Sequence, residues 1–142
     1  MSGCKTYIAE HEFWTSCRRL AYWRKPFDSL AEADAMAFDA RDSRRLVPAH
    51  RNGRCLRVTR KAADAVGRES RGGGVYYASR HEIRLASASF RWVLLHELAH
   101  AAVIERGHGS EFRCAYVSIV RDYIDDKAAD LLLDTFRQHH LR

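Results

Sequence analysis

The most informative pattern in the sequence is His96-Glu97-Leu98-Ala99-His100, in which two histidines stand four residues apart. Residues at this spacing share one face of an α-helix, about 6 Å apart along its axis, so both imidazoles can bind one metal ion. Glu97 follows the first histidine and can reach a metal-bound water without ligating the metal itself. A zinc ion makes such a water acidic, and Glu97 would accept its proton. The pattern therefore predicts a hydrolytic zinc site with Glu97 as its base.

A catalytic zinc ion commonly has three protein ligands and keeps one position for water. Glu105, His108 and Glu111 follow the motif and are candidates for the third ligand. Glu105 lies on the same predicted helix, five residues after His100, and points away from the motif histidines. His108 stands between two glycines, in a turn that lets the chain fold back over the metal. We predict His108 as the third ligand. Glu111 is the alternative ligand or a hydrogen-bond partner of a ligating imidazole, and an exposed turn histidine is the remaining interpretation of His108.

The segment around the motif has the composition of a buried helix. Between Trp92 and Ile104 the only polar residues are His96, Glu97 and His100. A helix that is apolar on almost every side belongs inside a domain. Two imidazoles and a carboxylate buried there without partners would cost several kcal/mol. A bound metal would satisfy them, and hydrogen bonds within the core are the structural alternative.

The rest of the sequence predicts a small sheet and further helices around this helix. Ser87 or Ser89 can cap the motif helix, and Gly107 can end it. We expect strands at 55–59, 75–78 and 82–86, and helices from 28 or 29 to about 41, at 110–122 and at 127–139. Segment 7–23 is a strand or a helix, and 48–53 and 67–74 are loops. The expected fold class is α+β, with a short, mainly antiparallel sheet packed on the motif helix in a single domain over residues 1–142.

Charge and composition restrict the class of protein further. The formal net charge is +6, and the positive excess is concentrated in segment 41–61. This segment contains Arg41, Arg44, Arg45, Arg51, Arg54, Arg57, Arg60 and Lys61, against the single acid Asp42. Such a cluster can contact nucleic acid or another acidic partner, but a solvated basic face is the simpler interpretation.

Cysteine usage and the N-terminal residues indicate where the protein works. Cys4, Cys17, Cys55 and Cys114 form no C-x-x-C pair, which favours free thiols in a reducing compartment and disfavours a zinc ribbon. The sequence contains no apolar run long enough to cross a membrane, and its first residues do not resemble a signal peptide. We expect a cytoplasmic protein without a membrane partner.

With these motifs in view, the chain resembles the SprT-like metallopeptidases. In that family a short hairpin precedes H-E-x-x-H, and a third histidine follows in H-G-x-x-F, here His108-Gly109-Ser110-Glu111-Phe112. The chain is still more similar, over nearly its whole length, to a family of small zinc metallohydrolases of mycobacteria and related actinobacteria. The shared features are Tyr7-Ile8-Ala9-Glu10, Gly72-Gly73-Gly74-Val75 and the Ala/Leu-rich segment 128–132.

The resemblance implies a zincin-like fold and hydrolysis of a protein or peptide substrate. Zincins commonly bind substrate along an exposed sheet edge, which the hairpin 75–86 could offer, with Tyr76 as a substrate contact or a packing residue. Tyr116 is a candidate for steadying the oxyanion, although a core tyrosine with a bonded hydroxyl is the simpler interpretation.

Two other functions remain open at this point. The first is a basic nucleic-acid-binding or adaptor module with a structural or catalytically idle zinc site. The second is a zinc hydrolase that acts on a non-peptide amide. Three protein ligands with an adjacent glutamate favour catalysis over a closed structural site.

Overall fold

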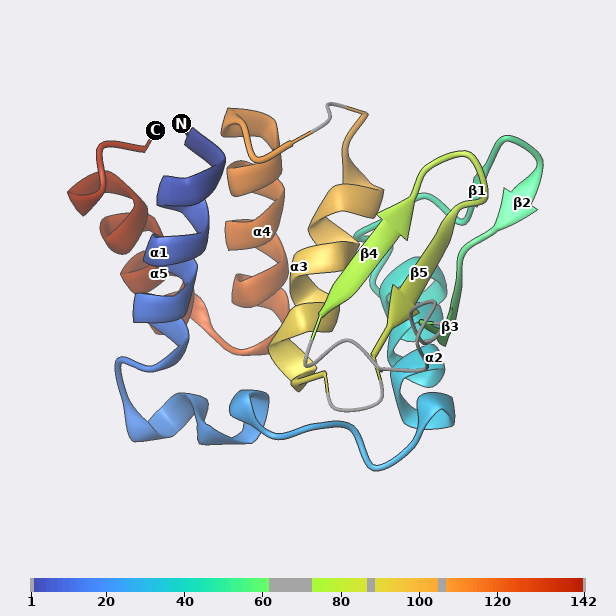
Figure 1. The fold of residues 1–142 in the computed structure, drawn as a ribbon, viewed down its shortest axis with the longest axis horizontal. Coiled ribbons are helices and arrows are strands. Elements are labelled where there is room, and N and C mark those ends of the chain that lie inside the picture. The colour runs from blue at the N-terminus through green and yellow to red at the C-terminus, as the bar shows by residue number, and fades with distance from the viewer. Residues whose placement is uncertain (1, 62–72, 87–88, 105–106, 142) are drawn as a thin grey trace, which may run out of the picture.

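The helix that carries the histidine motif, α3 (Arg91–Ala102), runs through the middle of the molecule (Figure 1). It is covered on both sides, because almost its whole surface is apolar: Val93, Leu94, Leu95, Leu98, Ala99 and Ala101 are buried. Helices cover one side of α3 and a small sheet covers the other. This computed structural model describes residues 2–61, 73–86, 89–104 and 107–141.

The helical side consists of α1 (Ser2–Trp14), α4 (Ser110–Tyr123) and α5 (Asp126–Gln138). α4 packs directly on α3, while α1 and α5 pack against each other (Figure 1). A 3-10 helix, η1 (Arg18–Arg24), returns the chain from α1 towards α3. The expected helices at 110–122 and 127–139 are confirmed to within one residue, and segment 7–23 is helical rather than a strand.

The sheet contains β3 (Arg57–Arg60), β4 (Gly74–Tyr77) and β5 (Glu82–Leu85) in the order β3-β5-β4. β4 pairs antiparallel with β5, as the expected hairpin requires, whereas β3 pairs parallel with β5. The buried Ile83 and Leu85 share one face of β5. β4 is therefore an edge strand of the sheet, and it lies beside α3.

Helix α2 (Leu30–Phe38) packs on β3, and a short π-helical turn, η2 (Asp39–Ser43), continues it. The side chain of Ser29 accepts a hydrogen bond from the backbone N–H of Glu32, so the expected N-terminal cap is present. The described part of the chain thus forms a mixed α+β domain. No helix within these residues is long and apolar enough to cross a bilayer.

Two expectations about local structure were wrong. The predicted loop at 48–53 contains half of a small hairpin, in which β1 (His50–Arg51) pairs antiparallel with β2 (Arg54–Cys55). Its turn is Asn52-Gly53, and both residues have positive φ, of 54° and 73°. Asn-Gly is the preferred sequence for a two-residue hairpin turn of this kind.

The ends of α3 also differ from the expectation. Its N-cap is Phe90, without a side-chain cap bond, and the hydroxyl of Ser89 instead donates to the carbonyl of Gly73. The helix ends at Ala102 rather than near Gly107. Gly107 still has the positive φ, 84°, that a turn towards α4 requires. Ser87, Glu105 and the part of the expected loop 67–74 up to Gly72 lie outside the described residues.

Gly74 permits a close approach between β4 and α3. A Cβ atom at this position would lie 2.9 Å from side-chain atoms of Leu85 and Val93, and 3.2 Å from Cγ of Glu97. The neighbouring Gly73 has much more space, since the nearest atom to its Cβ would be the end of the Lys61 side chain, at 3.8 Å. The edge strand can therefore reach the motif helix only because residue 74 has no side chain.

We expect Gly74→Ala to lower the free energy of unfolding by about 1–3 kcal/mol, because the added methyl group overpacks the β4–α3 contact. Gly73→Ala is the matched control and should change it by much less. Chemical denaturation of the two variants beside the wild type makes the measurement. Equal stability of the two variants would contradict the close approach at Gly74.

Candidate metal centre

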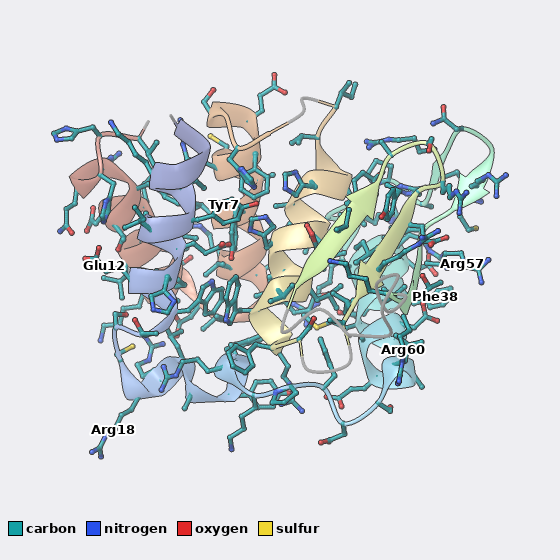
Figure 2. All side chains as sticks on the ribbon, viewed as in Figure 1. Tyr7, Glu12, Arg18, Phe38, Arg57 and Arg60 are labelled. Atoms are coloured by element: carbon teal, nitrogen blue, oxygen red, sulfur yellow. The ribbon has the colours of Figure 1, made fainter. Side chains whose placement is uncertain are left out.

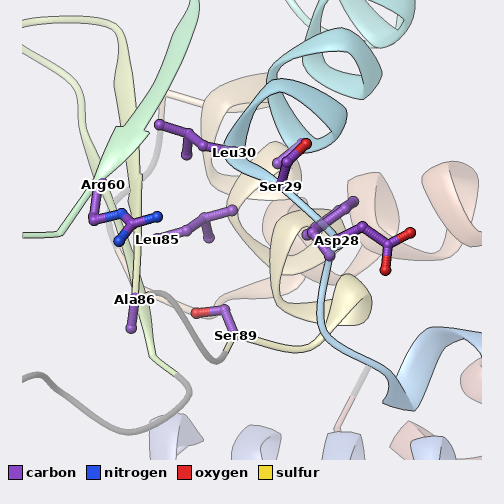
Figure 3. Close-up of a pocket in the computed structure, with 9 residues that line it drawn as sticks. Asp28, Ser29, Leu30, Arg60, Leu85, Ala86 and Ser89 are labelled. Carbon is purple, nitrogen blue, oxygen red and sulfur yellow. The ribbon is translucent and has the colours of Figure 1, made fainter.

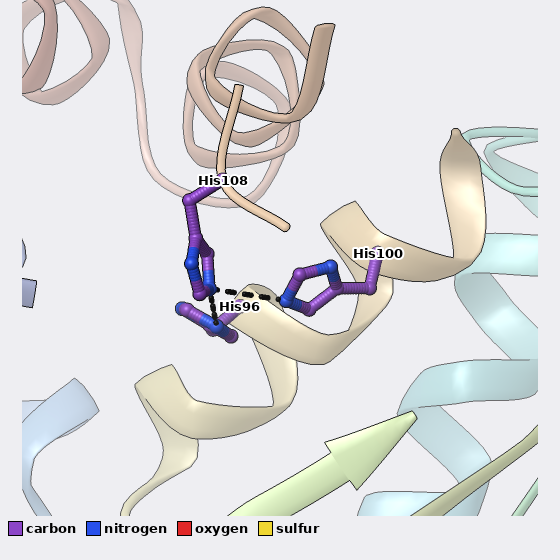
Figure 4. Close-up of side chains that lie close together, drawn as sticks. All are labelled: His96, His100 and His108. Atoms are coloured by element: carbon purple, nitrogen blue, oxygen red, sulfur yellow. Dashed lines mark hydrogen bonds between the residues drawn. The ribbon is translucent and has the colours of Figure 1, made fainter. Parts of the chain in front are cut away.

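Three imidazoles meet at one point between α3 and the segment that leads into α4 (Figure 4). His96 and His100 lie one turn apart on α3, and His108 reaches them from the start of α4. Nε2 of His108 lies 3.2 Å from Nε2 of His96 and 3.2 Å from Nε2 of His100. The three residues predicted as ligands are thus brought together.

The spacing of these nitrogens fits a tetrahedral metal ion. Zinc–nitrogen bonds of about 2.0–2.1 Å at tetrahedral angles place two ligand nitrogens about 3.3 Å apart. The two observed separations of 3.2 Å agree with this value. The three histidines can therefore hold a metal ion, and the geometry alone does not select which one.

The protonation states of the imidazoles also suit metal binding. Burial, together with the charge of the neighbouring His96, lowers the pKa of His100 to about 3 and that of His108 to about 4. Both rings are therefore neutral near pH 7, which leaves a nitrogen lone pair free for a metal. For His96, burial lowers the pKa, but the carboxylates of Glu10 and Glu97 outweigh burial and raise it above its ordinary value.

Glu10 fixes the orientation of His96. Its Oε2 accepts a hydrogen bond from Nδ1 of His96 at 2.6 Å, and both side chains are buried. Nε2 of His96 then faces the other two imidazoles with its lone pair. Such carboxylate–histidine pairs set the tautomer and orientation of metal ligands. Sequence reasoning had considered Glu111 for this hydrogen bond and had assigned no role to Glu10.

A sequence signal for Glu10 did exist. Thr6, Ala9, Glu10 and Phe13 are spaced as one face of a helix, and all four are buried in α1. An acidic residue on an otherwise buried face needs a partner. The partner itself could not be read from the sequence, because it lies 86 residues away.

Glu97 has an unsatisfied carboxylate oxygen beside the imidazole cluster. The residue is only 3% exposed, and its Oε2 has no hydrogen-bond partner among the described residues. Burial raises the pKa of Glu97 to about 7, with His96 acting in the opposite direction. A buried acceptor of this kind is costly unless a further group occupies the site, and a metal with its water would supply one.

Phe112 forms an apolar support under the cluster. Its ring centroid lies 4.4 Å from that of His100, 4.8 Å from that of His108 and 5.0 Å from that of His96. Phe112 is fully buried on α4, so the aromatic residue four positions after His108 restricts all three imidazoles by packing.

Two other candidates from the sequence lie outside the reacting space. Tyr116 is fully buried, and its hydroxyl accepts a hydrogen bond from Nε1 of Trp14 at 2.8 Å. Burial, followed by the charge of Glu10, raises its pKa well above the ordinary value. Tyr116 is therefore a core residue with a bonded hydroxyl, which was the simpler of the two interpretations of the sequence. Glu111 is exposed on α4 and is not part of the cluster, and Glu105 lies outside the described residues.

A cleft of about 490 Å³ opens in front of the cluster. Its walls are the whole of β4 on one side and Glu97, His100 and Val103 on the other, with Tyr7 also lining it. A second hollow, between the start of α2 and the sheet, is far smaller, at about 70 Å³, and is lined by none of the three histidines (Figure 3). The larger cleft, which Glu97 and His100 line, can therefore admit a substrate to the cluster.

Tyr76 lies on β4, but its hydroxyl is engaged within the protein. It accepts a hydrogen bond from Arg51 at 2.9 Å and lies 2.7 Å from Nδ1 of the buried His81. His81 in turn bonds to the carbonyl of Pro48 through Nε2. This network attaches the β1–β2 hairpin to the cleft wall, which favours the packing interpretation of Tyr76 and of His81.

The basic segment 41–61 is partly neutralised by contacts within the chain. Arg41 pairs with Asp42 and also donates to the carbonyl of Leu56. Arg44 pairs with Asp39 and Asp122.

Cys17, Cys55 and Cys114 are free thiols, as expected.

Comparisons of the chain with protein-family models, with curated proteins and with solved structures each found no match. The function is therefore inferred from the geometry of the candidate metal centre and its cleft.

We expect Glu10→Gln to weaken zinc binding by about 10–100-fold, because the neutral amide holds His96 less firmly and makes its ring less basic. Competition with a chelator of known affinity makes the measurement. Glu12→Gln is the control, since Glu12 is exposed on the same helix and its carboxylate bonds to His139, away from the imidazole cluster. Equal zinc affinity of the two variants would show that Glu10 does not position His96.

The raised pKa of Glu97 predicts that the stability of the metal-free protein depends on pH. Its pKa rises from an ordinary 4.5 to about 7 in the folded state, so the folded protein keeps this proton where the unfolded chain has released it. The resulting stability is fully present below pH 4.5 and is lost as the pH rises to about 7. A shift of this size corresponds to about 3 kcal/mol.

Glu97→Gln does not titrate and should escape this loss. With a chelator present, the wild type should become less stable relative to Glu97→Gln between pH 5 and pH 8, as measured by denaturant unfolding at both values. A constant difference between the two proteins would show that the buried carboxyl group has an ordinary pKa.

Proposed function

We propose that the protein is a zinc-dependent metallopeptidase of the SprT-like, zincin type. His96, His100 and His108 hold the zinc ion, and Glu97 is the catalytic base. The observation that carries the proposal is the unsatisfied Oε2 of Glu97, buried next to three converging imidazoles at the side of a cleft. A structural zinc site is closed by four protein ligands, whereas a catalytic site keeps a position for water.

In the proposed hydrolysis of an amide, each residue of the site has its own role. A zinc ion bound by the imidazoles would polarise the scissile carbonyl and lower the pKa of water. Glu97 accepts one proton of the attacking water as the water oxygen bonds to the carbonyl carbon. Glu97 then returns that proton to the nitrogen as the C–N bond breaks, and the products are a carboxylic acid and an amine. Glu10 holds His96 throughout, and Phe112 keeps the rings in place.

The shape of the cleft favours a peptide over a small amide. β4 forms one wall, and its outer edge is not paired with another described strand. An extended peptide can add to such an edge through main-chain hydrogen bonds. The same edge offers little to a compact non-peptide amide.

The nucleic-acid-binding alternative receives less support from the geometry. Arg41 and Arg44, at the N-terminal end of the basic segment, are held by acids of the same chain. Each ion pair reduces the positive charge available to a phosphate backbone. Near the cleft, Arg51 donates to the hydroxyl of Tyr76 and to the carbonyl of Val103, and Asn52 donates to the carbonyl of Ala78. These contacts attach the β1–β2 hairpin to the cleft wall.

We expect Glu97→Gln to keep the fold and one equivalent of zinc but to lose hydrolysis by about 10²–10⁴-fold, the usual range for a lost general base. The measurement is a proteome-wide comparison of cleavage products between the wild type and the variant, with elemental analysis of both proteins. Glu111→Gln is the control and should cleave as the wild type does.

Two results would count against the proposal. Hydrolysis by Glu97→Gln at the wild-type rate would show that Glu97 is not the base. A zinc-loaded wild type that cleaves no peptide, yet binds DNA with a steep salt dependence, would favour the adaptor function.

A further inference from the structure

Tyr7 presents a phenol to the metal centre from a helix on the opposite side of the cleft from β4. It lies on α1, three residues before Glu10, and is 55% exposed. Its ring is stacked on that of His96, with centroids 5.8 Å apart, and meets the ring of His108 edge-on at 4.7 Å. Figure 2 shows Tyr7 directed from α1 towards the centre of the molecule.

The cavities on the two sides of the centre place Tyr7 at their junction. The cleft of about 490 Å³ continues beside a second cavity of about 250 Å³, which His96 and Trp92 line. Among the residues that the structure describes, Tyr7, Gly74 and Glu97 are the ones that line both cavities. A peptide that occupied both would therefore pass between the edge strand at Gly74, the base Glu97 and the phenol of Tyr7.

The hydroxyl of Tyr7 is available to such a peptide. No described residue forms a hydrogen bond with it, in contrast to the hydroxyls of Tyr76 and Tyr116, which are both bonded within the protein. The position of Tyr7 is nevertheless restricted, because the hydrogen bond from His96 to Glu10 holds the next turn of α1 against α3.

From this arrangement we propose that Tyr7 is a catalytic residue that donates a hydrogen bond to the oxygen of the scissile carbonyl. The inference rests on the proposed peptidase function and names the electrophile of that same site. As the water oxygen bonds to the carbonyl carbon, an electron pair of the C=O bond moves to the carbonyl oxygen. The O–H of Tyr7 stabilises that negative charge without giving up its proton, and the pair returns as the C–N bond breaks.

A packing role would explain the ring of Tyr7 but not its hydroxyl. The ring contacts two imidazoles, so truncation to alanine would disturb the metal ligands as well as any contact with substrate. Tyr7→Phe keeps the ring and removes only the hydroxyl, which makes it the informative variant. Tyr22→Phe, an exposed tyrosine on η1 outside both cavities, is the matched control.

The experiment compares zinc-loaded wild type, Tyr7→Phe and Tyr22→Phe in three measurements. These are zinc affinity by chelator competition, kcat and KM on the best-cleaved peptide, and calorimetric affinity for a phosphinic peptide. In that probe a tetrahedral phosphinate anion replaces the scissile amide. We expect Tyr7→Phe to lower kcat by about 100-fold, with zinc affinity and KM unchanged, and to weaken phosphinate binding by a similar factor.

The other outcomes overturn the inference in distinguishable ways. If Tyr7→Phe retains wild-type kcat and phosphinate affinity, the hydroxyl has no catalytic role while the peptidase function stands. If its zinc affinity falls together with kcat, the hydroxyl of Tyr7 supports the metal site itself and not the carbonyl oxygen of the substrate. If the wild type neither cleaves peptides nor binds the phosphinic peptide, the proposed function fails and the role of Tyr7 fails with it.

Discussion

The hydrogen bond between His96 and Glu10 connects the first helix of the chain to the helix at its centre. It satisfies two groups that would each be costly to bury alone, and the surrounding apolar core strengthens it because water cannot compete. The orientation of one imidazole, the register of α1 against α3 and the position of Tyr7 all depend on this contact. The candidate metal centre therefore depends on tertiary contacts, although His96 and His100 are neighbours on a single helix.

At Glu97 the fold accepts the local cost of a buried carboxyl group beside three imidazoles. A carboxylate with an unsatisfied oxygen in the core opposes stability near neutral pH, and a glutamine of the same size would not. The side chain of Glu97 has little room to move away from this position. Gly74 lets the edge strand lie against Cγ of Glu97, and Phe112 restrains the neighbouring imidazoles. A residue that is unfavourable for stability, held in place by well-packed neighbours, is typical of functional sites.

Local patterns in the sequence predicted the elements that depend on interactions between residues close in sequence. The buried helix, the β4–β5 hairpin, the two C-terminal helices and the convergence of His96 and His100 follow from periodicity and turn residues. His108 was a correct choice of partner for this cluster because a turn can bring it back. Glu10, Tyr7 and the parallel pairing of β3 with β5 depend on contacts between distant segments, which periodicity does not encode. The β1–β2 hairpin was different, because Asn52-Gly53 carried its signal and was overlooked.

The packing of α1 against α5 has a consequence for synthesis of the chain. A ribosome releases all three histidines and Glu97 before it releases α5, on which α1 depends for much of its packing surface. A nascent chain at that stage carries the metal-binding motif but has Glu10 and Tyr7 on a helix that is not yet seated. Assembly of the full centre thus waits until α5 has left the ribosome and can pack against α1.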